Sequence, residues 1–367
     1  MITVEEFTAK FERMRSLIQA KGVGVLILSR RSNFAWLSCG GENYVVSSSE
    51  GGVGSLVVTP EKVYCLTTNI EVHRFLEEEL DGLPVDGLPY PWYEASEEPG
   101  RTLSKIVDGN FIGADGPGWD LDLSAEVVAL RYPLFPPEVD RYRSLGAKTA
   151  ILMSEVCRSL KPGMTELTMA ADLEKACTER GLEAYVRLIA FDERIDRYRH
   201  PIPTEKELEA RAMVVLCARE KGLIINLTRM VNLKPVDADL KRRHEACCRV
   251  DTALNLASKP GVALSEIFQQ GVHQYEAEGF PEEWKLHHQG GTTGYEGRDY
   301  FGNPTASEVL TDPSAVAWNP SIRGTKSEDT FLVTEQGVEN LCESKDWPQI
   351  ESKTDLGTLK RCDILEL

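Results

Sequence analysis

The segment HHQGGTTGYEGRD, residues 287–299, gathers side chains that transfer protons, ligate metals and form hydrogen bonds. Its adjacent histidines titrate near neutral pH, so either ring can exchange a proton or bind a metal ion. The Gly-Gly-Thr-Thr-Gly run lacks the lysine and the following helix of a phosphate-binding loop. The segment therefore predicts the lining of a catalytic or ligand site, and it leaves open whether that site uses a metal ion.

His287 and His288 stand next to one another in what the pattern predicts to be a strand. Because successive side chains of a strand point to opposite faces, we expect one ring to face the site and the other to face the core or solvent. His288 is the better candidate for the site because it comes nearer to the glycines.

The elements that must position this segment repeat along the chain. Lys161-Pro162-Gly163 and Lys259-Pro260-Gly261 lie 98 residues apart, and so do the glycines at positions 181 and 279 that close the following helices. In each copy a long helix ends at the break, and Thr165 or Ser265 can cap the second helix. We therefore expect two halves of paired helices plus strands, related by a pseudo-twofold axis, with a shared sheet and a cleft at its middle.

The first third of the chain alternates element types. Residues 11–22 have helical spacing, residues 23–29 form a continuous apolar run, and further strand and helix patterns follow. Three prolines within residues 132–140 then interrupt the pattern. The fold class is thus α/β (α+β), with a small α/β domain over 1–136 and the repeated domain over 137–367.

Composition narrows the classes of function. The net charge of −17 argues against nucleic acid and anionic membranes as partners. No apolar run is long enough to span a bilayer, and the charged N-terminus does not resemble a secretory signal. Nine cysteines without a CxxC pair predict reduced, mostly buried thiols in a cytoplasmic protein. Cys217 is a conceivable nucleophile, but its apolar strand favours a structural thiol.

Four segments resemble the pita-bread family of methionine aminopeptidase, aminopeptidase P, prolidase and creatinase. They are RMRSLIQAKGVGVLILSRRSNFAWLSC (13–39), EVDRYRSLGAKTAILMSEVCRSLKPGMTE (138–166), RYRHPIPTEKELEARAMVVLCAREKGLIINLTRMV (197–231) and AWNPSIRGTKSEDTFLVTEQGVENL (317–341). The resemblance covers nearly the whole chain. It implies the pita-bread fold for the second domain.

The resemblance also implies where a pair of metal ions would be held. The family uses two aspartates, one histidine and two glutamates, and at the matching positions this chain has Val215, Asn226, Thr292, Asn319 and Glu328. One carboxylate with neutral or apolar neighbours cannot replace the water lost by two divalent ions. We therefore expect no metal ion and no cofactor.

Creatinase, a member of the family, works without metal and implies roles for several residues here. His200 matches its general acid/base, Glu328 a carboxylate that binds the guanidinium, and Arg298 an arginine that binds the substrate carboxylate. Asp299 stands where creatinase has a glutamate, and Thr228 replaces a second guanidinium-binding glutamate. Simpler interpretations are a surface histidine, a salt bridge from Glu328 to Lys326 or an arginine, and an Arg298–Asp299 pair.

Other residues complete the expected binding site. Asn226, Asn319 and Thr292 can offer neutral hydrogen bonds or simply fill the emptied cavity, and we also place Thr228, Arg229 and His288 against the substrate. The leading hypothesis is a metal-independent hydrolase of a C–N bond in a small, zwitterionic amide, amidine or guanidine. The alternatives are a non-catalytic peptide or small-molecule binding protein and an Xaa-Pro peptidase. The family resemblance implies a homodimer, with Arg30 and Trp36 near the partner's cleft.

Overall fold

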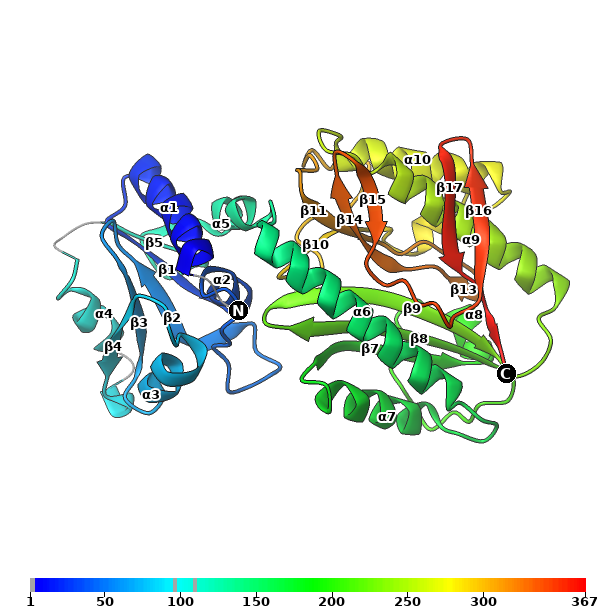
Figure 1. Ribbon diagram of the computed structural model, residues 1–367, viewed down its shortest axis with the longest axis horizontal. Coiled ribbons are helices and arrows are strands. Elements are labelled where there is room, and N and C mark those ends of the chain that lie inside the picture. Colours follow the sequence, from blue (N-terminus) through cyan, green and yellow to red (C-terminus); the bar gives the residue numbers. More distant parts are fainter. Residues whose placement is uncertain (1–3, 95–97, 108–110) are drawn as a thin grey trace. The chain divides into compact units, whose positions relative to one another are not determined.

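A computed structural model describes residues 4–94, 98–107 and 111–367 (Figure 1). The chain divides into two compact units, the first Met1–Pro133 with Lys221–Leu223 and the second Leu134–Glu220 with Ile224–Leu367. The domain boundary placed after residue 136 by the sequence stays a prediction. Within the described ranges, none of the helices is long and apolar enough to cross a membrane.

The first unit is built on a six-stranded sheet with the order β4-β3-β2-β1-β5-β6. The apolar run at 23–29 forms the central strand β1, which pairs antiparallel with β2 and parallel with β5. The elements of this unit are α1 (Val4–Lys21), β1 (Val25–Arg30), α2 (Arg31–Leu37), β2 (Gly51–Val58), β3 (Val63–Thr68), α3 (Val72–Arg74), η1 (Phe75–Glu79), β4 (Val85–Tyr90), η2 (Trp92–Glu94), α4 (Glu98–Leu103), β5 (Ile112–Ala114), β6 (Leu121–Asp122) and α5 (Ser124–Arg131).

The second unit contains the repeated halves. Its first half consists of α6 (Pro136–Arg158), α7 (Glu166–Thr178), β7 (Glu183–Phe191), α8 (Glu193–Arg197), β8 (Arg211–Glu220) and β9 (Leu223–Asn232). The remainder consists of α9 (Ala238–Ala257), α10 (Leu264–Ala277), η3 (Glu283–Leu286), β10 (Gly290–Thr293), β11 (Ser314–Trp318), β12 (Ser321–Ile322), β13 (Thr325–Lys326), β14 (Asp329–Thr334), β15 (Gly337–Asn340), β16 (Gln349–Thr354), β17 (Gly357–Cys362) and β18 (Leu365–Glu366). In Figure 1, α7 lies along β7 and α9 lies beside β16 and β17.

The predicted repeat is confirmed by the backbone. Gly163, Gly261, Gly181 and Gly279 all have positive φ angles, of 79°, 83°, 69° and 82°. A side chain at such a φ is strained, which explains why both breaks and both helix ends carry glycine. The matched spacing therefore reflects two copies of one backbone path.

The two predicted helix caps differ. The Thr165 hydroxyl accepts a hydrogen bond from the backbone N–H of Thr168 and caps α7. The prediction that Ser265 caps the second helix is wrong. The helix α10 begins earlier, and Ala263 occupies the N-cap position without a side-chain hydrogen bond. A backbone bridge lies at both helix starts, between residues 165 and 207 in the first copy and between residues 263 and 309 in the second.

The strands of the second unit form two four-stranded sheets, β18-β9-β8-β7 and β10-β11-β14-β15, and two two-stranded sheets, β12-β13 and β16-β17, where the sequence predicted one shared sheet. The sheets meet where β9 passes the start of β14. There the Thr228 N–H donates to the Glu328 carbonyl at 3.0 Å, and the Asn226 N–H donates to the Thr330 hydroxyl at 2.8 Å. We call this contact the seam; it brings residues about 100 positions apart side by side.

Candidate functional site

Three histidines form one cluster beside the seam. The possible ligand nitrogens of His200, His287 and His288 all lie within 4.8 Å of one another. The Nε2 atoms of His200 and His287 are 3.1 Å apart, and the ring centroids of His287 and His288 are 4.6 Å apart. His200 and His288 are exposed, whereas His287 is 8% exposed. The histidine cluster is thus reachable from solvent on one side.

The expected alternation of His287 and His288 is wrong. Both residues precede β10 in an irregular segment after η3, so the two-residue alternation of a strand does not apply. Nδ1 of His287 lies 3.4 Å from the Ser321 hydroxyl, which turns Nε2 toward His200. Phe301 packs edge-on against the ring of His288.

Glu328 lies at the centre of a charged group at the seam. One carboxylate oxygen accepts from Arg298 Nη2 at 2.9 Å; the other lies 2.8 Å from Lys326 Nζ and accepts from the Thr228 hydroxyl at 2.7 Å. The simpler sequence interpretation of Glu328, a salt bridge to Lys326 or an arginine, is therefore observed with both cations. We call Glu328, Lys326 and Arg298 the charged triad.

The pKa values reflect this arrangement. Burial works to raise the pKa of Glu328, but Lys326 and Arg298 outweigh it and hold that pKa at about 2. One side of the His288 ring is open to solvent, but the desolvation of the rest lowers its pKa to about 4, with the positive charges of Arg298 and Lys326 acting in the same direction. Burial, followed by the charge of Lys326, also lowers the pKa values of His200 and His287. All three rings are consequently neutral near pH 7.

A returning loop carries Arg298 and Asp299 back toward β10. The Thr292 N–H donates to the Tyr300 carbonyl at 3.0 Å, and the Asp299 N–H donates to the Thr292 carbonyl at 3.2 Å. Gly291 permits this approach, because a Cβ there would lie 2.0 Å from the Tyr300 carbonyl oxygen. Arg298 reaches Glu328 in this way, while Asp299 is half-buried and the Thr292 hydroxyl accepts from the Tyr300 N–H.

Two of the predicted neutral residues offer unused acceptors. Asn226 donates from Nδ2 to the Thr293 hydroxyl at 3.0 Å, and that hydroxyl donates to the Glu296 carbonyl, which fixes the orientation of the amide. The side-chain oxygens of Asn226 and Asn319 are buried without a hydrogen-bond partner among the described residues. A buried acceptor without a donor is costly, so both positions suit a ligand that donates N–H or O–H.

Arg229, also predicted as a binding residue, points its side chain away from this group. It follows Thr228 in β9. Its buried guanidinium pairs with Asp329 at 2.7 Å and donates to the Cys342 carbonyl at 3.0 Å.

Cys217 is buried, and burial raises the pKa of its thiol to about 12, which suits a structural thiol. All nine cysteines are free, as the sequence predicted.

The sequence prediction did not include Lys326 among the site residues. It stands two positions before Glu328, and in extended backbone this spacing places two side chains on the same face. That spacing was the available signal. The approach of His200 to His287, 87 residues later in the chain, had no such local signal.

The residues at the family's metal positions do not fit a pair of metal ions. Val215 belongs to an apolar core cluster with Leu188, Met213 and Met230. The carboxylate of Glu328 is already neutralised by two cations, and the Asn226 amide presents its N–H group to Thr293. A dinuclear centre needs several anionic or imidazole ligands around both ions. These positions supply a single carboxylate, and two cations of the chain already pair with it.

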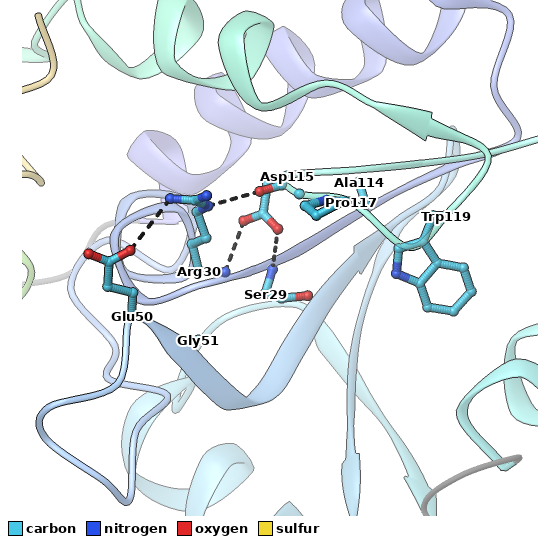
Figure 2. Close-up of a pocket in the computed structure, with 9 residues that line it drawn as sticks. Ser29, Arg30, Glu50, Gly51, Ala114, Asp115, Pro117 and Trp119 are labelled. Atoms are coloured by element: carbon cyan, nitrogen blue, oxygen red, sulfur yellow. Dashed lines mark hydrogen bonds and ion pairs between the residues drawn. The ribbon is translucent and has the colours of Figure 1, made fainter.

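A separate pocket lies in the first unit and is lined by Ser29, Arg30, Glu50, Asp115 and Trp119, among others (Figure 2). The Asp115 carboxylate accepts from the backbone N–H groups of Ser29 and Arg30, each at 2.9 Å, so this carboxylate already has hydrogen-bond donors from the same unit.

Trp36 is fully buried in this unit. The expectation that Trp36 reaches a partner's cleft is therefore wrong, whereas Arg30 is accessible.

Comparison with known proteins identifies the architecture. The model of metallopeptidase family M24 matches residues 140–335. A prolidase from Pyrococcus horikoshii OT3 is similar with a TM-score of 0.76 and 16% identity over 92% of this chain and 99% of that chain. An Xaa-Pro dipeptidase from Bacillus anthracis has a TM-score of 0.76 and 18% identity over 98% of this chain and 100% of that chain.

The same fold occurs in a protein whose name states no peptidase activity. The N-terminal domain of FACT complex subunit SPT16 from Cicer arietinum has a TM-score of 0.70 and 12% identity over 94% of this chain and 97% of that chain. No curated protein matches the chain. The predicted α/β pita-bread architecture is confirmed by these matches.

Proposed function

The chain belongs to metallopeptidase family M24, and on that premise we propose that it hydrolyses a C–N bond without the family's pair of metal ions. The substrate class is a small, zwitterionic amide, amidine or guanidine. The observation that carries the proposal is the neutral, accessible His200 beside the charged triad, whose Lys326 and Glu328 both act on it electrostatically.

The charges of the triad support a substrate with a carboxylate. Two cations face one carboxylate, so the group carries an excess positive charge in a largely buried setting. Arg298 and Lys326 would bind the anionic end of the substrate. Glu328 and Asp299 would bind its nitrogenous end. The unpaired oxygens of Asn226 and Asn319 would accept N–H groups from the same molecule. These ion pairs and hydrogen bonds would hold the scissile C–N bond in position next to His200.

The reaction we propose uses His200 as general acid/base. The neutral imidazole takes a proton from water as the water oxygen bonds to the substrate carbon; the C–N bond then breaks and the imidazolium returns the proton to the leaving nitrogen. His287 lies 3.1 Å from His200 and orients its ring through the shared Nε2–Nε2 contact. No other co-reactant is needed.

Two alternative functions have weaker support than the hydrolase. The structural likeness to prolidases and Xaa-Pro dipeptidases favours an Xaa-Pro peptidase, but the changed metal positions argue against it. The likeness to the SPT16 domain favours a non-catalytic binding protein for a peptide or small molecule.

We also propose that the protein forms a homodimer, because the family resemblance implies one. We propose a cytoplasmic location because all nine cysteines are free.

The first test is a ligand screen followed by turnover. A thermal-shift screen with small amides and guanidino acids identifies compounds that raise the apparent stability. For a compound that is turned over, His200→Ala should lower kcat by roughly 100-fold or more while keeping most of the binding. The exposed His273 on α10 provides the matched control, and His273→Ala should leave kcat unchanged.

Three outcomes would count against the proposal. Unchanged turnover in His200→Ala would exclude that histidine as the acid/base. Loss of turnover after removal of metal by a chelator, with recovery on adding manganese or zinc, would favour the peptidase. Saturable binding without turnover of any compound found by the screen would favour the binding protein.

A further inference from the structure

We propose that His200, His287 and His288 form a binding site for a single Zn²⁺ ion. The chain has six histidines, and half of them meet in this cluster. The remaining three lie elsewhere: His73 pairs with Glu77, His244 is buried in α9, and His273 is exposed on α10. The inference does not depend on the proposed hydrolase function, since it concerns binding of the ion itself.

The geometry is close to that of a three-histidine site. Tetrahedral Zn²⁺ with ligand nitrogens at about 2.0–2.1 Å places those nitrogens about 3.3 Å apart. The Nε2 atoms of His200 and His287 are already 3.1 Å apart, and the third ligand nitrogen lies within 4.8 Å of both. Binding would require a small rotation of the exposed His288 ring to close the remaining gap. The fourth position stays open to solvent or to a ligand.

The ring of the buried histidine is held in an orientation that suits a metal ligand. Nδ1 of His287 lies 3.4 Å from the Ser321 hydroxyl, while Nε2 faces the cluster. Metal-binding histidines in general use the second ring nitrogen for such a contact, which fixes ring orientation and tautomer. Phe301 limits the movement of His288 from the other side.

The ligand set selects the ion. Three imidazoles without a carboxylate favour Zn²⁺ and related transition metals over Mg²⁺ or Ca²⁺, which prefer oxygen. None of the three histidines occupies a metal position of the family, so this is a different site from the dinuclear centre. Lys326 and Arg298 oppose the ion by repulsion, while Glu328 offsets part of that charge. The two cations favour an anion in the open fourth position.

Metal binding and acid/base chemistry would compete for the same lone pair on His200. Zn²⁺ at the cluster is therefore expected to inhibit the turnover proposed above, whereas a chelator should leave that turnover intact. A failure of the hydrolase proposal would not affect the binding measurement, which needs no substrate.

The test is calorimetric titration of the untagged, chelator-treated full chain with Zn²⁺, with Mg²⁺ as a second probe. We expect one Zn²⁺ per chain and no binding of Mg²⁺ in the same range. His288→Ala should weaken Zn²⁺ binding at least about tenfold. This variant removes an exposed ring, so its fold is expected to persist, and His273→Ala is the control that should bind as the wild type does.

Absence of Zn²⁺ binding by the wild type would overturn the proposal. So would equal affinity in His288→Ala and the wild type, or equal losses in His288→Ala and His273→Ala. Titration with Co²⁺ gives a second readout, because a three-histidine site produces the intense visible absorption of a four- or five-coordinate ion. Weak octahedral absorption identical to that of the free ion would contradict the assignment.

Discussion

Glu328 shows how one side chain changes its role when its neighbours change. In a metal site a carboxylate at this position would face cations from solution, but here Lys326 and Arg298 supply the positive charge from the chain itself. The buried carboxylate keeps its charge because two ion pairs and the Thr228 hydroxyl replace its lost water. A ligand must therefore exchange contacts with these residues to bind at Glu328.

The pKa of Glu328 predicts a pH-dependent stability. The group has its pKa lowered from 4.5 to about 2, so its stabilising effect is present above pH 4.5 and is lost as the pH falls through about 2. Glu328→Gln should lower the free energy of unfolding by on the order of 3 kcal/mol at pH 7. The difference should shrink between about pH 4.5 and 2, as measured by urea unfolding of both proteins. A difference that stayed constant over this range would contradict the ion-pair account.

Among the helices, the two copies of the repeat differ most clearly where their second helices begin. The hydroxyl of Thr165 satisfies the Thr168 N–H at the start of α7, whereas Ala263 at the start of α10 offers no side-chain acceptor. Backbone hydrogen bonds hold both helix starts in the same way. In the first copy they are Gly163 N–H to Leu208 O at 2.9 Å and Glu166 N–H to Lys206 O at 3.0 Å, and in the second Gly261 N–H to Leu310 O at 2.8 Å and Leu264 N–H to Glu308 O at 2.9 Å. The same backbone contacts thus hold both copies, and only the first copy adds a side-chain cap.

This difference predicts unequal responses to alanine substitution at the two positions. Thr165→Ala should destabilise the protein by about 1 kcal/mol, because it removes an N-cap hydrogen bond. Ser265→Ala should change stability by less than about 0.5 kcal/mol, because Ser265 lies inside the helix and alanine favours helix. Chemical unfolding of the two variants side by side gives the comparison. Equal losses would show that Ser265 has a capping role that the structure does not assign to it.

Across the second unit, four charged side chains connect elements from both halves of the repeat. Arg229 on β9 pairs with Asp329 on β14, and Arg361 on β17 pairs with Asp329 and with Asp251 on α9. All four side chains are buried, with 1% exposure or less. Because this network reaches Asp329, the residue that follows Glu328, it holds the backbone beside that carboxylate.

Breaking the network should be costly for the whole unit. Asp329→Ala would leave two buried guanidinium groups without one of their carboxylates and should lower the free energy of unfolding by about 3–5 kcal/mol. Asp140→Ala, at an exposed carboxylate 3.6 Å from Arg143, should change it by less than about 1 kcal/mol. Thermal and urea unfolding of both variants checks the prediction. A small effect of Asp329→Ala would mean that the arginines find other partners.

The sequence by itself determined the repeat, the glycines with positive φ that end its helices, and the family to which the chain belongs. These features depend on local backbone constraints and on long matching segments, which can be read along the chain. Only the tertiary structure decided that both His287 and His288 join His200, that Arg298 joins Lys326 at Glu328, and that Arg229 faces Asp329 instead. Such contacts depend on how loops and strand faces meet across the seam, and residues far apart in the chain carry no local signal of that meeting.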